Sequence, residues 1–202
     1  MAIAKRKKRF YNVEIPLIEK TTQLQAYEPK DLDGRHIKYD LTRILKGKSM
    51  LLTSKISVKD EEAKVISKEI KLMAFYLKRL TRKGTSYVED SFSTNCKNGK
   101  LRIKPFLVTR KKVSRRVGRA LREMIKKELI EYVKDKDSES LFDEILKNKL
   151  QKTLSLKLKK IYPLSVCEIR VLKVEEFFEE LEKPKEKKES KKSEKSEEPK
   201  KE

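Results

Sequence analysis

The side chains of this chain with the clearest potential for a chemical function are clustered arginines and lysines. The densest run lies between residues 100 and 127, where twelve cations face one acidic residue, Glu123. Arginine binds phosphate in bidentate fashion and stacks on exposed bases, and each neutralised phosphate releases a counterion. A solvated surface normally mixes both signs of charge. We therefore interpret the run as a nucleic-acid contact rather than a solvated basic face, made by Lys100, Arg102, Arg110, Lys111, Lys112, Arg115, Arg116, Arg119, Arg122 and Lys126.

Two further basic segments are candidates for phosphate contact. The first ends in the glycine and hydroxyl residues 84–86, whose small donors suit phosphate, although cations are also expected at the end of an ordinary helix. Its cations are Lys78, Arg79, Arg82 and Lys83. The second is an N-terminal arm that we expect to become ordered on binding; a localisation signal or a solvated arm are the alternatives. Its cations are Lys5, Arg6, Lys7, Lys8 and Arg9.

Enzymatic and metal chemistry finds little support in the sequence. Cys96 and Cys167 are two isolated thiols, whereas a zinc site needs four clustered ligands, so we expect buried thiols in a reducing compartment. His36 is the sole histidine, and we expect a structural role for it. No phosphate-binding glycine motif occurs, and we expect Glu175 and Glu176 on a solvated helix face. We predict no enzyme, cofactor, metal or small-molecule substrate; a carboxylate-based metal nuclease is the alternative left open.

Composition defines the class of partner. The 202 residues include 53 Lys+Arg against 32 Asp+Glu, a net charge of +21, with 42% charged and 37% apolar residues. Ordinary domains have about 25% charged and about 45–50% apolar residues. The length of 202 residues excludes a large multidomain enzyme. The charge balance favours a polyanionic partner, nucleic acid before an anionic membrane surface. We find no membrane-spanning run and no secretory signal, so we expect a cytoplasmic protein without a membrane partner.

The last twenty residues differ in composition from the rest. Residues 183–202 hold nine Lys and six Glu and no aliphatic or aromatic residue, so they contribute only +3 of the +21. Such a segment cannot bury enough surface to offset its ordering entropy, and we expect it to be disordered. The predicted organisation is a basic arm at 1–9, a single α+β RNA-binding domain at 10–182 and a disordered tail at 183–202.

Hydrophobic periodicity predicts the elements that position these cations. Residues 17–31 are expected to be loop, and Asn98-Gly99 predicts a hairpin with a type I′ turn. Leu72, Phe75, Tyr76 and Leu80 indicate one helical face. Apolar residues alternate or recur at helical spacing elsewhere. We expect strands at 11–15, 37–41, 50–58, 65–72, about 88–96, 101–108 and 166–174, and helices at 72–82, 114–133 and 138–158.

Four short motifs, in order, resemble one known family. They are Arg9-Phe10-Tyr11-Asn12-Val13-Glu14-Ile15-Pro16; Leu32-Asp33-Gly34-Arg35 with Tyr39-Asp40-Leu41; Asn98-Gly99-Lys100-Leu101-Arg102 with Val108-Thr109-Arg110-Lys111-Lys112; and Lys160-Ile161-Tyr162-Pro163-Leu164 with Glu168-Ile169-Arg170. Together they are similar to the archaeal and eukaryotic small-ribosomal-subunit family called S-three-Ae, or e-S-one. The short basic extension before the first motif is more archaeal than eukaryotic in type.

The resemblance implies a β-rich, barrel-like antiparallel central domain flanked by helices. It also implies a structural, non-catalytic place on the small-subunit platform near the messenger exit. The partners would be small-subunit rRNA, neighbouring small-subunit proteins and messenger RNA near the exit. Cations in matching motifs carry over as expected rRNA contacts: Arg9, Arg35, Arg102, Arg110, Lys111 and Lys112. A non-ribosomal RNA-binding or RNA-chaperone protein and an RNA-processing enzyme are the alternatives.

Overall fold

The computed structural model describes residues 7–45, 47–59 and 62–178. The N-terminal half is mostly strand, and the C-terminal half combines strands with helices, so the α+β prediction is confirmed. The elements in chain order are β1 (Arg9–Ile15), β2 (Lys20–Ala26), the 3-10 turn η1 (Pro29–Leu32), β3 (His36–Asp40), β4 (Met50–Lys59), β5 (Glu62–Leu72), α1 (Ala74–Leu80), β6 (Tyr87–Glu89), β7 (Phe92–Asn95), β8 (Gly99–Thr109), α2 (Arg115–Lys134), α3 (Ser138–Leu146), α4 (Lys149–Leu158) and β9 (Leu164–Phe177).

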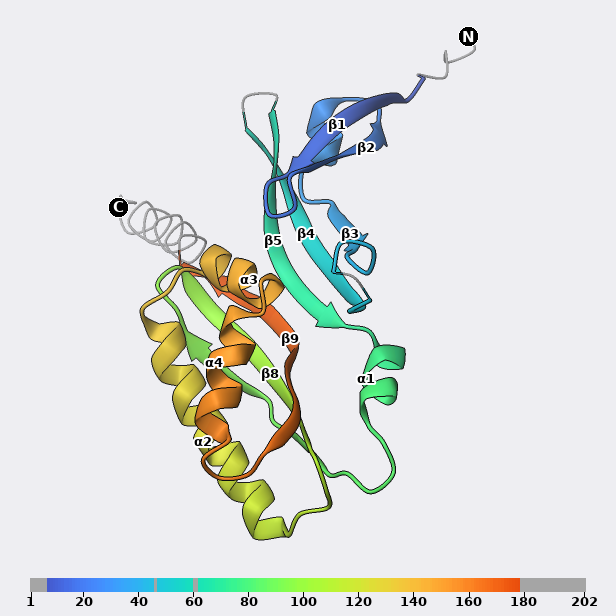
Figure 1. Cartoon of the computed structure of the whole chain (residues 1–202). Helices are drawn as coiled ribbons and strands as arrows, with labels where there is room; N and C mark the ends of the chain where they lie inside the picture. Colours follow the sequence, from blue (N-terminus) through green and yellow to red (C-terminus); the bar gives the residue numbers. More distant parts are fainter. Residues whose placement is uncertain (1–6, 46, 60–61, 179–202) are drawn as a thin grey trace, which may run out of the picture.

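Seven strands form the main sheet, and all of its pairs are antiparallel. The order is β3-β4-β5-β9-β8-β6, with β7 also pairing with β8, so the described sheet is open and has β3 and β6 as its ends. Only three residue pairs join β5 to β9. β1 and β2 form a separate two-stranded ribbon. It lies beside the end of β4 and the start of β5 (Figure 1).

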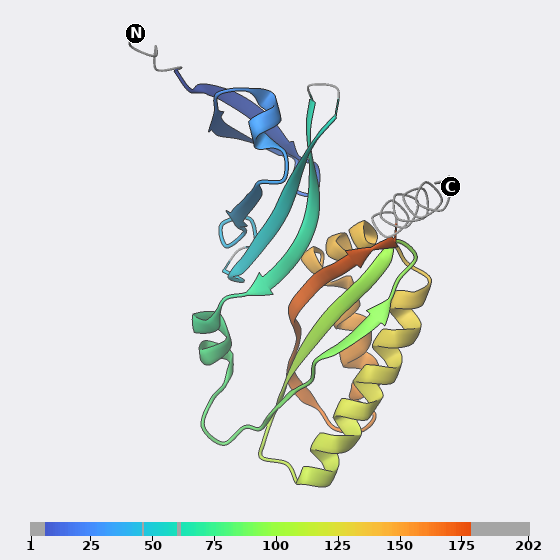
Figure 2. The ribbon, with the colours of Figure 1, turned by 180° about the vertical axis from the view of Figure 1, so that it is seen from behind.

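Three helices cover one face of the C-terminal part of the sheet. α2, α3 and α4 lie in front of β8 and β9 in Figure 1 and behind them in Figure 2. The alternation of buried and exposed side chains along β8 explains this arrangement, since Leu101 and Ile103 are buried while Arg102 between them is exposed. The buried apolar residues of these helices, such as Leu121 and Ile125 of α2, belong to one continuous core. This core also contains residues of the N-terminal strands.

A buried polar cluster links the two halves of the chain. The Lys48 ammonium, in the turn before β4, donates to Glu168 Oε2 of β9 at 2.6 Å and to Asn148 Oδ1 at 2.7 Å. Asn148 joins α3 to α4 with a left-handed φ of 56°. Gln151 of α4 also approaches Glu168, at 3.5 Å. Because a buried charge needs a partner, this cluster fixes the turn, the helix junction and β9 relative to one another.

Two predicted elements are wrong. Residues 17–31 contain β2, which pairs with β1 along its whole length; its outward residues are threonine and glutamine, so the apolar alternation is too weak to detect. The expected helix at 138–158 is two helices, α3 and α4. The break at Asn148 was missed because the apolar spacing continues across it, whereas asparagine adopts left-handed backbone more readily than other non-glycine residues.

Two predictions were right in element and wrong in detail. The helix α1 exists, and Tyr76 and Leu80 of the predicted apolar face pack against the core, but Phe75 is exposed and Leu77 is buried in its place. The β7–β8 hairpin exists, with Cys96 N donating to Gly99 O at 2.8 Å, but neither Asn98 nor Gly99 has positive φ, so the turn is not type I′. Gly99 is needed because a Cβ there would lie 2.3 Å from the Glu176 backbone oxygen of β9. The pairing of β8 with β9 shifts register between Lys104 and Pro105.

Candidate nucleic-acid interface

Of the twenty predicted contact residues, Lys5 and Arg6 lie outside the described residues, as do the tail residues 183–202. Lys100 is half-buried, and the other seventeen cations are exposed. Exposure alone does not make a binding surface. We therefore examine which cations the fold brings together and which are already engaged by other groups.

The pairing of β6 with β8 brings two sequence clusters to one end of the molecule. Ser86 is the connecting residue, since its backbone N–H donates to Thr109 Oγ1 and its carbonyl accepts from Thr109 N at 2.9 Å. Its hydroxyl also accepts from Val113 N at 3.3 Å. The cations before Ser86 are thereby placed next to those after β8. This juxtaposition could not be inferred from their spacing in the sequence.

Helix α2 directs the densest group of cations outward. Leu121, Ile125, Leu129 and Val133 are buried along it, and the helix packs against β6 and β7. The buried apolar residues and the exposed arginines of α2 are therefore on different sides of the helix. Arg115, Arg119 and Arg122 line one shared hollow, whereas Lys126 lies apart from it, with its ammonium 5.9 Å from the centre of the Phe92 ring.

We call the cations at this end the α2 surface, defined as Arg82, Lys83, Arg110, Lys111, Lys112, Arg115, Arg116, Arg119 and Arg122. All nine are exposed. Within the described part of the chain none of them forms an ion pair with a carboxylate, whereas other cations do, such as Lys157 with Glu128 and Lys136 with Glu144. Unneutralised arginines and lysines at one place produce a strong positive potential, which suits a phosphate backbone.

A second group of cations lies at the opposite end, around the start of β1 (Figure 1). The Lys8 ammonium lies 5.5 Å from the centre of the Tyr27 ring, and Arg35 Nη1 donates to Gln25 O at 3.1 Å. Arg9 pairs with Ala26 across the β1–β2 ribbon. The arm and Arg35, which are separate in the sequence, therefore meet at the end of β2. We call Lys7, Lys8, Arg9 and Arg35 the β1 surface.

The remaining candidates are engaged within the protein or stand apart. Arg79 lies over the Tyr76 ring, 5.4 Å from its centre, and donates to Gly47 O at 3.4 Å. Arg102 forms an ion pair with Glu175 on the helix-free face of the sheet. Glu175 and Glu176 belong to β9, so the expectation of a helix face for them is wrong. Lys78 and Lys100 belong to neither surface.

Sequence reasoning missed an exposed aromatic side chain at the start of β6. Tyr87 is the first residue of β6 and is 64% exposed. Its ring stacks on the buried Phe106 ring, with centroids 6.3 Å apart and planes 23° apart. Residue 87 also borders the hollow of about 340 Å³ that Arg115, Arg119 and Arg122 line. Its neighbour Val88 faces Gly118 of α2, however, so alternation along β6 directs the Tyr87 ring to the opposite face of the sheet. Alternating aromatic and basic residues would have signalled it, but Tyr87 is separated from the arginines by almost thirty residues of sequence.

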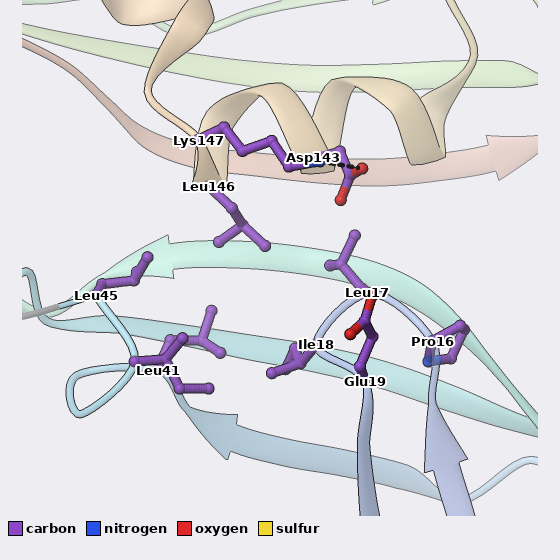
Figure 3. A pocket seen from close by; sticks show the side chains of 10 residues that line it. Pro16, Leu17, Ile18, Glu19, Leu41, Leu45, Asp143, Leu146 and Lys147 are labelled. Atoms are coloured by element: carbon purple, nitrogen blue, oxygen red, sulfur yellow. Dashed lines mark hydrogen bonds and ion pairs between the residues drawn. The ribbon is translucent and has the colours of Figure 1, made fainter.

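A second hollow, of about 350 Å³, lies where the β1–β2 turn meets α3. Figure 3 shows Leu17 of that turn and Leu146 of α3 directed toward one another, with Leu41 and Leu45 beside them. The rim carries the exposed ion pair of Asp143 with Lys147. Its lining is mainly aliphatic, so it offers few groups for phosphate contact.

Neither His36 nor the two cysteines belongs to a metal site within the described residues. His36 is exposed at the start of β3, and within the described residues no three His, Cys, Asp or Glu side chains cluster as a metal site would require. Both cysteines are free; Cys96 is buried and Cys167 is half-buried. Desolvation, reinforced by Glu168, raises the pKa of the Cys167 thiol to about 12, so it stays protonated and unreactive. No helix in the described ranges is long and apolar enough to cross a membrane.

The fold and its two surfaces define a class of protein: a basic α+β scaffold that presents cations at both ends and suits a nucleic-acid partner. Comparison with known proteins then identifies the family within this class. The Ribosomal S3Ae family model matches residues 4–177. The chain therefore belongs to the ribosomal S3Ae family, whose members are structural, non-enzymatic ribosomal components, and this confirms the predictions of the family and of a non-enzyme.

Archaeal relatives extend over most of the chain. It is 25% identical to the small ribosomal subunit protein eS1 of Nanoarchaeum equitans over 178 residues, which covers 84% of this chain and 90% of the relative. It is 29% identical to the protein of the same name from Halorubrum lacusprofundi, covering 85% of this chain and 84% of the relative. The eS1 protein of Haloarcula marismortui is also 29% identical, with coverage of 86% and 85%.

Proposed function

We propose that this protein is a structural constituent of the small ribosomal subunit and binds small-subunit rRNA through the α2 surface and the β1 surface. The single observation that carries the proposal is the α2 surface, where nine exposed cations from three chain segments meet without a carboxylate partner in the described residues. The names of the archaeal relatives support the choice of particle. The protein would act in translation, in the cytoplasm.

The mechanism is charge neutralisation combined with shape recognition. Cations at two opposite ends of one rigid scaffold contact different RNA segments, and each phosphate contact releases a counterion. Residues 10–182 would act as a single RNA-binding domain. Its position would be the platform near the messenger exit, as the family resemblance implies, with ribosomal proteins and messenger RNA as neighbours.

Sucrose-gradient sedimentation tests whether the protein is a constituent of the small ribosomal subunit. An antibody against the native chain should detect it in the small-subunit fractions of a lysate, and dissociating the subunits from one another at low magnesium should leave it in those fractions. If the chain stays at the top of the gradient in both conditions, it is not a ribosomal constituent.

Salt dependence of RNA binding tests the α2 surface. Replacing Arg115, Arg119 and Arg122 together with alanine should lower the slope of log affinity against log salt by up to about 0.7–0.9 for each lost phosphate contact. Filter binding of a small-subunit rRNA fragment over a range of salt concentrations measures this slope.

Two control variants accompany the triple substitution. Replacing the same arginines with lysine keeps the charge and should keep most of the slope. Removing three exposed lysines of α4 and its C-terminal end, at Lys149, Lys152 and Lys159, changes the net charge equally and should leave the slope nearly unchanged. An equal loss in the arginine and α4 variants would mean that net charge alone matters and that the α2 surface is not the contact.

A further inference from the structure

The β1–β2 ribbon turns one face toward the core and the other toward solvent. Val13 and Ile15 of β1 are buried, whereas the residues that alternate with them are exposed or half-buried. Successive side chains of a strand point to opposite faces, and directly paired residues of two strands share a face. The register of the ribbon therefore defines its solvent face, which includes Phe10 paired with Gln25 and Asn12 paired with Gln23.

Two aromatic rings stand on this solvent face. Phe10 is 63% exposed and Tyr27 is 46% exposed. Tyr27 follows the buried Ala26, so alternation directs its ring to the side on which Phe10 lies. The Lys8 ammonium lies 5.5 Å from the centre of the Tyr27 ring, as expected if these two residues continue the register beyond the last pair of the ribbon. Phe10 and Tyr27 are then diagonal neighbours across the ribbon, a relation that aromatic side chains can span.

The cations of the β1 surface lie at the same end of the ribbon. All four are exposed, and the ion pairs of residues 7–45, 47–59 and 62–178 include none of them. Arg35 Nη1 donates to Gln25 O, so its guanidinium lies against the strand that ends beside the second ring. Glu14, on the solvent face, lies four residues from Phe10, about 13 Å along β1, and Glu28 is outnumbered by the four cations. The end that carries the rings therefore has an excess of positive charge.

These groups suit unpaired nucleotides better than a duplex. Bases inside a duplex are stacked on both faces, whereas the bases of a loop or a single strand offer a free face to an aromatic ring. RNA-binding sheets use aromatic side chains on one face in this way, each stacking on a base. The amides of Asn12, Gln23 and Gln25 can hydrogen-bond to base edges, and the cations can contact the flanking phosphates.

The neighbours of the two rings favour RNA over a protein partner. The buried centre of a protein–protein interface is depleted of charged residues and mainly apolar. Around Phe10 and Tyr27, by contrast, the solvent face consists of amide, hydroxyl and ammonium groups. A protein that covered the rings would have to desolvate these polar groups, whereas single-stranded RNA provides partners for them.

We propose that the solvent face of the β1–β2 ribbon binds unpaired RNA nucleotides, with bases stacked on Phe10 and Tyr27 and phosphates on the cations of the β1 surface. This inference rests on the proposed RNA-binding function and adds a preference for single-stranded RNA at this end of the molecule.

A fluorescent reporter at the first ring tests the proposal in the full-length chain. The sequence contains no tryptophan, so Phe10→Trp introduces a single indole, whose emission is quenched when a base stacks on it. An oligouridylate of roughly ten nucleotides should quench most of this emission. An RNA duplex with the same number of phosphates should leave it nearly unchanged. RNA bound at the α2 surface, at the opposite end of the molecule, does not contribute to this signal (Figure 1).

Phe75→Trp is the matched control, because Phe75 is 57% exposed but belongs to α1. Its emission should be the same with and without either probe. Both ring positions of the ribbon are exposed, so we expect Phe10→Trp and the variants of Tyr27 to keep the wild-type melting temperature. This measurement distinguishes a loss of binding from a loss of folding.

The second ring is tested in the background of Phe10→Trp. Adding Tyr27→Ala should weaken the oligouridylate affinity, measured by titration of the quenching, by about 5- to 150-fold, the usual loss for one stacked base. Adding Tyr27→Phe keeps a ring and should leave the affinity nearly unchanged.

The outcomes separate this proposal from the proposed function. Quenching by the oligouridylate alone, weakened by Tyr27→Ala and kept by Tyr27→Phe, establishes the site. If filter binding shows that the wild-type chain binds RNA but the Phe10→Trp emission is unquenched, or is quenched equally by the duplex, the nucleotide site is wrong, RNA binding stands and the rings are left to a protein partner. Quenching that does not depend on residue 27 also overturns the two-ring site. If the wild-type chain binds neither probe, both proposals fail.

Discussion

At the scale of single residues, Gly99 and Gly118 differ in how much space surrounds them: Gly99 is tightly enclosed by backbone atoms, whereas Gly118 is not. A Cβ at Gly99 would lie 2.3 Å from a backbone oxygen of β9, whereas a Cβ at Gly118 would make one ordinary contact at 3.8 Å. The first glycine permits two strands to approach closely. The second only lowers the helix propensity of α2.

The same substitution at these two glycines should therefore have opposite effects. Gly99→Ala should lower the free energy of unfolding by about 1–3 kcal/mol, since a fixed backbone must shift to make room. Gly118→Ala should leave it unchanged or raise it by up to about 1 kcal/mol through helix propensity. Urea denaturation of both variants measures the difference. Equal effects would show that the contact at Gly99 does not constrain β9.

Residue-level reasoning from the sequence found the cations but not all of their surroundings. The exposed arginines of α2 are where their spacing places them, because a charged side chain on an amphipathic helix has only one favourable side. Arg102 and Arg79 were selected by the same criterion and are engaged by Glu175 and by Tyr76. Glu175 is 73 residues from Arg102 in the sequence, and a count of charges does not register the Tyr76 ring three positions before Arg79.

At the scale of elements, strong hydrophobic periodicity predicted helices and strands correctly, whereas weak periodicity did not. α2 spans Arg115–Lys134 where the predicted helix spans 114–133, and the strand predicted at 166–174 lies within β9. β2 was missed because pairing with β1, rather than an apolar face, holds it in place. The division of α3 from α4 depends on Asn148, whose contact with Lys48 is made across a hundred residues.

The polar cluster at Lys48 offers a test of how these elements are held together. Lys48→Met removes the cation and leaves Glu168 largely buried without its charge partner, so the free energy of unfolding should fall by up to about 3–5 kcal/mol. Replacing both residues with methionine should cost less than the single change, since no unpaired charge remains. Urea denaturation of the single and double variants measures this coupling.

A surface pair provides the control for this experiment. Asp143 and Lys147 are both substantially exposed, and Lys147→Met should change the free energy of unfolding by less than about 1 kcal/mol. If Lys48→Met costs no more than Lys147→Met, the buried cluster does not contribute to holding the turn, α4 and β9 together.

At the scale of the whole molecule, the net charge of +21 is carried mainly by residues 1–182. The tail at 183–202 contributes +3 of it, and the described cations gather into two surfaces at opposite ends. Composition predicted a polyanionic partner, and the order of motifs predicted the family. The gathering of residues 82–86 with 109–119 could not be predicted, because it depends on which strand pairs with β8.

Removal of the tail tests the predicted organisation of the chain. A variant ending at residue 182 should keep the melting temperature of the full chain within about 1–2 °C, because the deleted residues contain no apolar side chain that could join the core. Scanning calorimetry measures this. A large fall in melting temperature would show that the tail packs on the domain and that the predicted boundary is wrong.

The position of β9 in the sheet has a consequence for the order of events during synthesis. β9 is the last strand of the described chain, yet it lies between β5 and β8, and its pairing with β5 joins residues about a hundred positions apart, such as Glu69 and Lys173. The β3–β4, β4–β5 and β7–β8 hairpins can close as soon as they emerge, because local pairings form fastest. Until β9 arrives, the nascent chain therefore carries two half-sheets with open edges at β5 and β8, which are vulnerable to aggregation. β9 converts them into one sheet, so this sheet can be completed only after β9 has been synthesised.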